Sequence, residues 1–559
     1  MLRSKSLKAA VISAAVALTF TACASEPDNN GGGDNAPAND NNAEVNDGNA
    51  DNTNTNNEGE GGEASDEDAD PSNLVIATLS DANSLDPHGS NDVPSSAVQH
   101  NIFETLISQN EEAELEPLLA TEWEATEDNV WTVQLREDVT FHDGSDFTAD
   151  DVKATFDRVL DEDVASERAF LYEMVEEVVV VDDYTVEFHT EYPFAPFPSH
   201  LAHTGGSIMS AEVIEEDYAA MEDGGQPGDY LNENPIGTSF FQFEEWSPGT
   251  EIVLSRNDDY WGDTAGVEQV TFRVSPEGLT RIGELETGAA DIIYPVSPSD
   301  TSRIEETDGI HMYEQESLSL AYIGFNMQKE PLDDQQVRQA LSMAINKDDL
   351  IEGVYEGAAT PAVGPIGEQV FGFSDEIDAL DYDPERAQEL LAEAGYEDGF
   401  DTTIWTNDSD ERIAVAELVQ AQLSVIGVNA EIEVLEWGAY LDNTAAGEHD
   451  MFILGWVTVT ADADYGMYAL FHSEQQGAAG NRSFMDNAEL DEILDEARRE
   501  PDEATREDLY EQAMEILVEE APMLYLYHTD YLVGVRDEVE GFWKHPNGIY
   551  QLRDVTIEQ

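Results

Sequence analysis

The sequence predicts an α/β protein made of several lobes. Segments with strand-like patterns and segments with helical spacing alternate from residue 73 to the C-terminus. No repeat of fixed period underlies this alternation. Residues 73–559 are too many for one hydrophobic core, so two or three domains are expected.

The first folded segments are mostly strands. "NLVIATLS" from Asn73 predicts a buried strand, and "AVQHNIFETLIS" (97–108) has helical spacing. "VWTVQLREDVTFHDG" (130–144) alternates like one strand of a hairpin, with a turn at its His-Asp-Gly end. Thr148 is placed to cap a helix in "ADDVKATFDRVL". "VVVVDDYTVEFHT" (178–190) predicts two strands joined at the Asp-Asp pair.

Helices prevail further along the chain. Strands are still expected in "TEIVLSRNDDYWG" (250–262), "VEQVTFRVSP" (267–276) and "NAEIEVLE" (429–436). Amphipathic helices are expected in four segments: "DQQVRQALSMAINKDDLIEGVYEG" (334–357), "PERAQELLAEAGY" (384–396), "RIAVAELVQAQLSVIGV" (412–428) and "DEATREDLYEQAMEILVEEAP" (502–522). Gly395 is placed to end the second of these helices.

The N-terminus predicts export. Basic residues at positions 3, 5 and 8 precede a short apolar run, residues 9–20, which is well below the roughly 20 residues that span a bilayer. Thr21-Ala22-Cys23 then resembles the end of a bacterial lipoprotein signal, although Phe20 stands where that motif usually has Leu. The resemblance implies a signal peptide over residues 1–22 and a lipid on Cys23. The alternative is a lone buried cysteine.

Cys23 is the only cysteine, so the mature chain forms no internal disulfide. Residues 23–72 continue as a tract of Asn, Asp, Gly and Glu with almost no large apolar side chain. Such a tract cannot bury enough surface to offset its conformational entropy, so we expect a disordered acidic linker. Its typical reach is about 40 Å for a flexible chain of this length.

The charge is strongly acidic. The chain has 122 acidic and 23 basic residues, a net charge of −99, and residues 26–72 hold only 14 of the acids. Such self-repulsion destabilises a compact state unless salt screens it, so the composition favours a protein that works at high salt. Nucleic-acid binding is excluded because a phosphate backbone would be repelled.

No catalytic motif is present. The sequence has no G-x-S-x-G, H-E-x-x-H, Walker-type loop or Rossmann fingerprint. His200 and His203 share a helical spacing, but no second ligand pair lies near them, so a pair with a structural role is favoured over a metal site. No cofactor and no metal are expected, and an enzyme is unsupported.

The run "DMFILGWVTVTADADYGMYALFHS" (450–473) carries the candidate site. Met451 to Thr460 predicts a buried strand, and Asp462 and Asp464 follow its end. In open α/β sheets, ligands gather beyond the carboxyl ends of strands. A carboxylate held there suits an ammonium group. The alternative is a strand that ends in a solvated acidic turn.

Ordered blocks over most of residues 73–545 resemble the family 5 extracellular solute-binding proteins of bacterial ABC transporters, the dipeptide- and oligopeptide-binding proteins. The blocks are "NSLDPH" (83–88), "NIFETLI" (101–107), "LEPLLATEWEATEDNVWTVQLREDVTFHDG" (115–144), "NPIGTSFFQF" (234–243), "RNDDYWG" (256–262), "IGFNMQKEPLDDQQVRQALSMAINKDDLI" (323–351), "DPERAQELLAEAGY" (383–396) and "EWGAYLDNTAAGEHDMFILGW" (436–456).

The resemblance implies ligand-binding roles for specific residues. Asp462 would pair with the free α-amino group of a peptide, with Asp464 as the next acid. Gly455 and Trp456 would form a wall that offers backbone groups to an extended ligand. Arg412 would clamp the ligand carboxylate, although it does not align cleanly with the arginine of the family. The family's Gly-Thr-Gly-Pro reads Gly-Thr-Ser-Phe at residues 237–240, and its Asp-Pro reads Asp-Ala at residues 462–463.

The resemblance also implies a class II periplasmic-binding-protein fold, with three lobes and a hinged ligand cleft. Lobe I would comprise residues 73–99, 233–325 and 526–559, lobe II residues 100–232, and lobe III residues 326–525. The hinge candidates are the crossings near residues 100, 235, 325 and 525.

The implied function is a monomeric, lipid-anchored receptor that is not an enzyme. It would work at the outer face of the cell membrane or in the periplasm, and deliver short peptides to an ABC permease. The same fold could instead bind a nickel chelate, glutathione or an oligosaccharide. Trp405, Trp437 and Trp456 keep the sugar alternative open, because a sugar cleft is lined with aromatic side chains. A secreted hydrolase is a further alternative, from another class.

Overall fold

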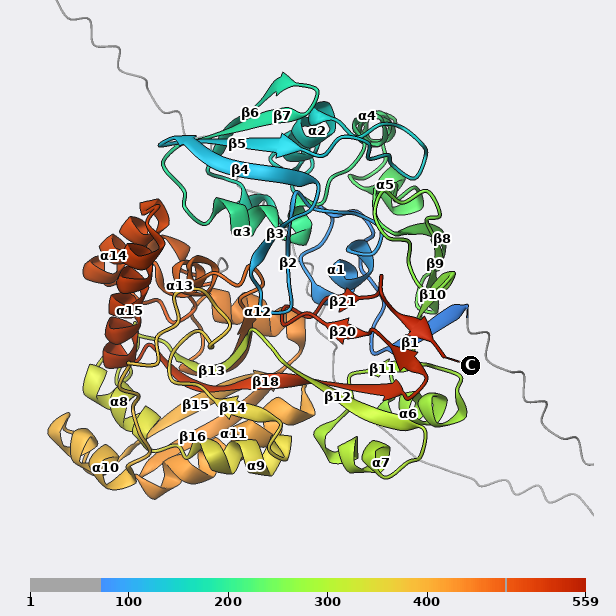
Figure 1. Cartoon of the computed structure of the whole chain (residues 1–559). Coiled ribbons are helices and arrows are strands. Elements are labelled where there is room, and N and C mark those ends of the chain that lie inside the picture. The colour runs from blue at the N-terminus through green and yellow to red at the C-terminus, as the bar shows by residue number, and fades with distance from the viewer. Residues whose placement is uncertain (1–71, 478–479, 559) are drawn as a thin grey trace, which may run out of the picture. The chain divides into compact units, whose positions relative to one another are not determined.

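A computed structural model describes residues 72–477 and 480–558 (Figure 1). Its main feature is one large mixed sheet of twelve strands. Ten of them follow each other in the order β16 (Val428–Leu435), β15 (Phe400–Asn407), β17 (Met451–Val457), β13 (Ser319–Phe325), β18 (Met523–Arg536), β11 (Ile292–Tyr294), β1 (Asn73–Thr78), β10 (Gln269–Val274), β9 (Glu251–Arg256) and β8 (Phe241–Ser247). The two others, β12 (Ile310–Glu316) and β14 (Ala359–Pro361), pair with β18.

Strand β18 joins the two halves of this sheet. Its first residues pair with β13, and Asp530–Arg536 pair with β12 (Figure 1). On the β13 side lie the helices α8 (Gln335–Met343), α9 (Lys347–Tyr355), α10 (Pro384–Glu393), α11 (Asp410–Val425), α12 (Trp437–Ala445), α13 (Ala463–Phe471), α14 (Ala488–Arg499) and α15 (Glu503–Glu520). On the β12 side lie α6 (Gly278–Thr287) and α7 (Thr301–Glu305).

A separate four-stranded sheet is formed by β4 (Ala120–Glu127), β5 (Val130–Leu135), β7 (Thr185–Thr190) and β6 (Val175–Asp182), in that order (Figure 1). Helices α2 (Ala149–Val159), α3 (Phe197–Leu201), α4 (Ala211–Glu222) and α5 (Asp229–Glu233) accompany it. We call residues 119–233 the small-sheet module. The chain enters it after α1 (Val93–Gln99), β2 (Ile107–Gln109) and β3 (Leu115–Pro117).

Short strand pairs lie near the C-terminus. Strand β20 (Trp543–Lys544) pairs with β21 (Tyr550–Gln551), and β19 (Val539–Glu540) pairs with β22 (Thr556–Ile557). The buried apolar side chains gather in separate clusters, one of them inside the small-sheet module around Phe156 and Phe188. The α/β class with several cores is therefore confirmed. The predicted lobe boundaries stay a prediction.

Most predicted elements form where the sequence places them. The strand at 73–80 is β1, the capped helix at 149–160 is α2, and the strands at 178–190 lie within β6 and β7. Thr148 and Asp151 bond reciprocally as a capping box at the start of α2. Gly395 has a φ of +91° just after α10, the left-handed conformation that favours glycine at a helix end.

Four predicted elements differ from the structure. The predicted helix at 97–108 is wrong, because α1 ends at Gln99 and residues 101–107 then cross between two parts of the protein. They are buried on every side, so their apolar spacing reflects burial and not a helix face. The predicted helix at 334–357 is two helices, since Asn346 caps a new helix by accepting from the Asp348 N–H (3.2 Å). The predicted strand at 451–460 ends at Val457.

The fourth difference concerns residues 130–144. Strand β5 ends at Leu135, and the turn at Gly144 (φ +85°) closes only a short bridge between Thr140 and Asp146. Most of the segment after β5 therefore runs as irregular chain.

A buried charge network fixes the start of the folded chain. Arg158 of α2 donates to both carboxylate oxygens of Asp86 (3.1 and 2.8 Å) and to Asp217 of α4 (2.8 Å). All three side chains are almost fully buried. The "NSLDPH" segment is thus held against the small-sheet module.

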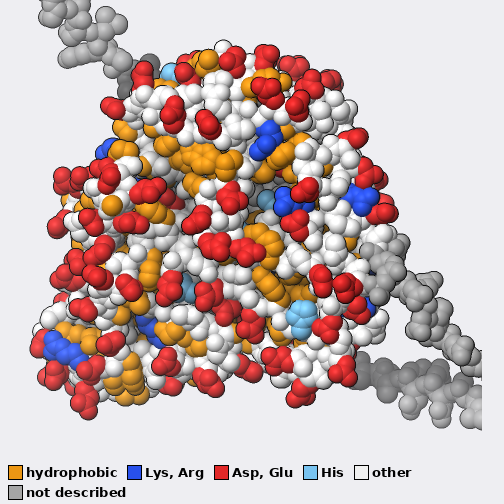
Figure 2. All heavy atoms as spheres, in the orientation of Figure 1, with side chains coloured by type: hydrophobic (Ala, Val, Ile, Leu, Met, Phe, Trp, Pro, Cys, Tyr) orange, Lys and Arg blue, Asp and Glu red, His pale blue; other side chains and the backbone are white. Residues whose placement is uncertain are grey.

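No helix among residues 72–477 and 480–558 is long and apolar enough to cross a membrane. Figure 2 shows Asp and Glu side chains over most of the visible face and few Lys or Arg side chains. The predicted signal peptide, Cys23 and most of the acidic linker lie outside the described residues.

Candidate ligand-binding site

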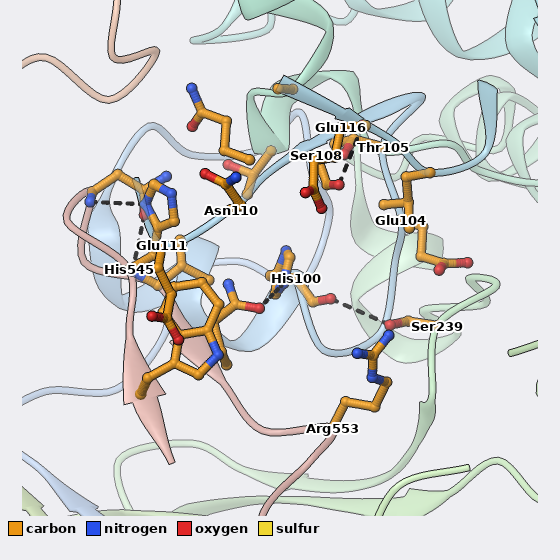
Figure 3. Close-up of a pocket in the computed structure, with 18 of the residues that line it drawn as sticks. His100, Glu104, Thr105, Ser108, Asn110, Glu111, Glu116, Ser239, His545 and Arg553 are labelled. Carbon is orange, nitrogen blue, oxygen red and sulfur yellow. Dashed lines mark hydrogen bonds between the residues drawn. The ribbon is translucent and has the colours of Figure 1, made fainter. Parts of the chain in front are cut away.

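Two adjoining cavities lie between the large sheet, the small-sheet module and the C-terminal strands. The larger, about 460 Å³, is lined by residues between positions 100 and 118 and by residues between 543 and 554 (Figure 3). The smaller, about 190 Å³, lies at the end of β17. The two share Thr204, Asn547 and Ile549, so they form one cleft.

Acids dominate the larger cavity. Its lining includes five carboxylates, and Arg553 is the single basic residue among the described lining residues. The carboxylates belong to Glu104, Glu111, Glu112, Glu116 and Asp554. Burial lowers the pKa of His100 and lowers that of His545 to about 4, so both imidazoles are neutral at pH 7. The cavity therefore suits a polar or cationic group.

Glu104 is the most altered of these acids. Its carboxylate accepts hydrogen bonds from Tyr260 Oη (2.8 Å), Trp261 Nε1 (2.9 Å) and Thr238 Oγ1 (2.8 Å). Burial raises its pKa to about 7, and these hydrogen bonds only partly oppose that effect. Thr238 belongs to the segment in which this sequence departs from the family pattern, and that segment is thus tied to the cavity wall.

The smaller cavity contains two of the sequence-predicted residues, Gly455 and Trp456. The Trp456 ring packs on Tyr465 of α13, with centroids 5.3 Å apart. The buried Trp456 Nε1 has no hydrogen-bond partner among the described residues, so a donor is left at this wall. Asn91, Ser96 and His203 also line this cavity.

Arg412 also lies at this strand end. A Cβ atom on Gly455 would be 3.7 Å from Arg412 Nη2. Its Nη1 donates to Asn407 Oδ1 (2.9 Å), and its guanidinium lies 5.6 Å from the centre of the half-exposed Trp437 ring. Trp405 is only 9% exposed and lines neither cavity. The structure thus brings Gly455, Trp456 and Arg412 together and leaves Trp405 in the core.

Asp462 lies outside this cleft lining. It is 3% exposed and caps α13 by accepting from the Asp464 N–H (2.9 Å). Its two oxygens accept from the two terminal nitrogens of Arg506, one at 2.8 Å. Burial alone would lower the pKa of Arg506, but the Asp462 charge outweighs this and holds that pKa above its usual value. A ligand ammonium would have to displace this arginine, so the geometry does not favour the predicted pairing.

Asp464 is also held within the chain. Its carboxylate lies 2.9 Å from Arg498 Nε of α14 and 3.9 Å from His200 Nε2 of α3. The backbone N–H of Ala195 donates to the Arg498 carbonyl (2.7 Å), so this cluster joins the small-sheet module to α13 and α14. The other histidine of the predicted pair, His203, lines the smaller cavity. The described residues contain no group of three or more His, Cys, Asp or Glu placed to hold a metal.

Comparison with known proteins identifies the family. The model of the bacterial extracellular solute-binding proteins, family 5 middle region, matches residues 114–478, more than half of the chain. The chain belongs to this family. Family 5 proteins bind solutes for ABC importers outside the cytoplasm and are transport proteins rather than enzymes.

Individual relatives agree with this assignment. The chain is 34% identical over 470 residues to the dipeptide-binding protein of Escherichia coli (strain K12), covering 80% of this chain and 86% of that protein. It is 30% identical over 495 residues to the glutathione-binding protein GsiB of Pectobacterium atrosepticum, covering 87% and 94%. The solved structure of the binding protein DppA from Helicobacter pylori, in complex with the peptide STSA, has a TM-score of 0.76 at 32% identity and covers 87% and 98%.

The fold is therefore that of the family 5 periplasmic binding proteins, as the sequence predicts. Sequence reasoning missed Glu104, the acidic cavity and Lys544 of β20, which lines a neighbouring cavity. Nothing in the sequence distinguishes Glu104 from the other acidic residues, of which the chain has 122. A signal existed for Lys544, because a basic residue inside the aromatic segment "GFWKHPNGIY" is conspicuous among only 23 basic residues.

Proposed function

We propose that this chain captures short peptides at the outer face of the cell membrane, held there by a lipid on Cys23, and delivers them to an ABC permease. The observation that carries the proposal is the cleft formed by the two cavities, in a chain of a solute-binding family. A peptide backbone would lie along the end of β17 at Gly455 and Trp456. Its ammonium group would face the acidic larger cavity.

Three parts of this proposal come from the sequence: the partner of the ligand carboxylate, the closure of the lobes and the monomeric state. Arg412 is retained as a candidate for the ligand carboxylate because it lies beside Gly455. Closure of the lobes over the peptide would remove water from these contacts, which strengthens charge pairs that salt otherwise screens. The mature chain is proposed to act as a monomer.

The test is isothermal titration calorimetry in 2 M NaCl with a panel of di- and tripeptides. Micromolar or tighter binding of several peptides supports the proposal. Binding of none, with tight binding of another solute class, would refute it. Native mass spectrometry of protein purified at high salt would identify any solute that is retained.

Glutathione is the second candidate, favoured by the 30% identity to a glutathione-binding protein. It is itself a peptide with an extra carboxylate, and the acidic larger cavity would repel that group. Glutathione belongs in the same titration panel. An oligosaccharide has less support, because Trp405 lies in the core and Trp437 lines neither cavity. Of the three tryptophans that favoured a sugar, Trp456 alone is among the described lining residues of the cleft, which also include Trp543.

The lipid anchor is tested separately. Metabolic labelling with a fatty-acid probe should label the wild-type chain and not Cys23→Ser. Equal labelling of both would exclude Cys23 as the attachment point.

A further inference from the structure

A buried lysine lies next to the cleft without an acidic partner. Lys544 of β20 is 1% exposed, and its Nζ donates to the Gly548 carbonyl. The ammonium group lies 3.8, 4.4 and 5.0 Å from the ring centres of Tyr550, Tyr294 and Tyr531. No ion pair within residues 72–477 and 480–558 involves Lys544, although acids outnumber bases fivefold in this chain. Among the described residues, the charge is stabilised by one carbonyl and three aromatic faces.

Lys544 faces an apolar cavity of about 320 Å³. Its lining is mostly apolar and includes side chains of α1, β9 and β10, among them Val98, Ile252 and Phe272. Lys544 is the single basic residue among the described lining residues. The single acid, Asp81, already accepts from Trp246 Nε1 (3.1 Å) and from the Gly249 N–H (2.7 Å). A hydrocarbon group that carries one negative charge would complement this lining.

The apolar cavity adjoins the proposed peptide cleft. It shares Val93 and Val457 with the smaller cleft cavity. Val457 is the last residue of β17 and follows Gly455 and Trp456 directly. A ligand that lies along the end of this strand can therefore extend one residue into the apolar cavity.

Lys544 has no carboxylate partner among the described residues. Burial of the ammonium group lowers the pKa of Lys544 to about 7, because its hydration is lost and no carboxylate replaces it. A charge-assisted hydrogen bond to a carboxylate would be strong here, since the ammonium group is buried and its surroundings are largely apolar. The hydroxyls of Tyr294, Tyr531 and Tyr550 make no hydrogen bond to other described residues, so they are further donors at the same wall.

We propose that this cavity binds the C-terminal residue of the captured peptide, with an apolar side chain against Val98, Ile252 and Phe272 and the terminal carboxylate on Lys544. The inference rests on the proposed peptide-binding function and specifies it further. It replaces Arg412 as the carboxylate partner and predicts a preference for peptides that end in Leu, Val, Ile or Met.

The experiment compares alanyl-leucine with its C-terminal amide by calorimetry in 2 M NaCl at pH 6. The wild-type chain should bind the free acid at least 30-fold more tightly than the amide. Lys544→Met keeps the length of the side chain and should reduce this ratio to below 3. Lys153→Met, at an exposed position of α2, is the matched control and should keep the wild-type ratio. A wild-type chain that binds acid and amide equally overturns the inference without any variant.

Two further outcomes show whether Arg412 or Lys544 holds the carboxylate, and whether this inference or the proposed function has failed. If Arg412→Gln removes the preference and Lys544→Met does not, Arg412 holds the carboxylate and the inference is wrong. If no peptide binds, the proposed function is wrong. Thermal-shift assays with 4-methylpentanoate and 4-methylpentanamide then test the Lys544 site independently of peptide binding. Stabilisation of the wild type by the acid only, lost in Lys544→Met, supports the subsite; no stabilisation by the acid overturns it.

Discussion

The carboxylate of Asp462 and the guanidinium of Arg506 form a two-point ion pair, although the two residues are 44 positions apart. Both side chains are nearly buried. Arg506 also donates to Tyr510 Oη (3.0 Å) and lies over the Phe371 ring, 4.8 Å from its centre. The pair therefore fixes the start of α13 against α15. This gives Asp462 a structural task, in contrast to the ligand-binding task that its place after the Gly-Trp strand suggests.

We predict that Asp462→Asn and Arg506→Met each lower the free energy of unfolding by about 3–5 kcal/mol, because each leaves one buried charge unpaired. Asn still caps the helix, so the loss reports the charge pair. Combining the two changes should restore part of the stability, because no unpaired charge then remains. Urea unfolding in 2 M NaCl measures all four proteins.

The same variants test the alternative role. Peptide affinity of Asp462→Asn should stay within about threefold of wild type at a temperature where the variant is folded. Normal stability together with lost peptide binding would instead restore Asp462 as the ammonium partner.

Most of the fold could be predicted from the sequence. Local residue patterns indicate most of the helices and strands, and the ordered sequence blocks resemble those of a known family. The helix at α2 has its cap and its acidic first turn within a few residues of each other. The crossing segment at 101–107 was mispredicted because burial on all sides gives an apolar pattern that a helix face also gives.

The site was less predictable for a physical reason. An acid that binds a ligand and an acid that pairs with a distant arginine look the same in a sequence, and Arg506 is remote from Asp462 along the chain. The chain has 122 acids, so the position of any one is weak evidence of function. Gly455, Trp456 and Arg412 do lie together, because two of them are adjacent on β17 and the third follows β15, the strand beside it.

Glu104 predicts a pH dependence of stability. Its folded-state pKa of about 7 lies above the ordinary value of 4.5, so between these pH values the folded state retains a proton that the unfolded state has lost. The stability from Glu104 is therefore fully present below pH 4.5 and is lost as the pH rises through 7. Glu104→Gln is neutral throughout and should not show this loss. The difference in unfolding free energy between wild type and variant, measured from pH 4.5 to 8 at constant salt, should change in favour of the variant; a constant difference would contradict the assignment.

Lys544 predicts a dependence in the opposite direction. Its folded-state pKa of about 7 lies below the ordinary value of 10.5, so the folded state binds fewer protons than the unfolded state between these values. The unfolding free energy should thus rise with pH across this window. Lys544→Met should be more stable than wild type at pH 6, by a few kcal/mol since one pKa unit is about 1.4 kcal/mol, and this advantage should vanish near pH 10.5. A pH-independent difference would show that burial does not disfavour the charge.

The contacts of Arg498 predict that peptide affinity depends on how the small-sheet module packs against α13 and α14. It lies against Asp464, packs 3.7 Å from the centre of the Tyr468 ring, and contacts Phe194 of the small-sheet module. Arg498→Met removes these contacts and should shift the molecule toward an open form, which lowers peptide affinity by about tenfold if a tenth of the molecules remain closed. Arg386→Met, at an exposed position of α10, is the matched control, because its ion pairs lie within its own helix. Small-angle scattering should show a larger radius of gyration for Arg498→Met alone, and equal radii would argue against a closing contact.

The charge of −99 predicts a stability that depends on salt. Asp and Glu side chains are scattered over the whole visible face, and few Lys or Arg side chains lie among them (Figure 2). The Debye length falls from about 10 Å at 0.1 M salt to about 3 Å at 1 M, so repulsion between neighbouring carboxylates is then largely screened. We expect the free energy of unfolding to rise as the salt concentration increases from 0.1 to 2 M. NaCl and KCl should act alike, because both consist of monovalent ions and give the same ionic strength. Sucrose at equal osmolality leaves the charges unscreened and should stabilise less. If sucrose matched the salts, exclusion of cosolute from the surface, and not screening, would account for the effect.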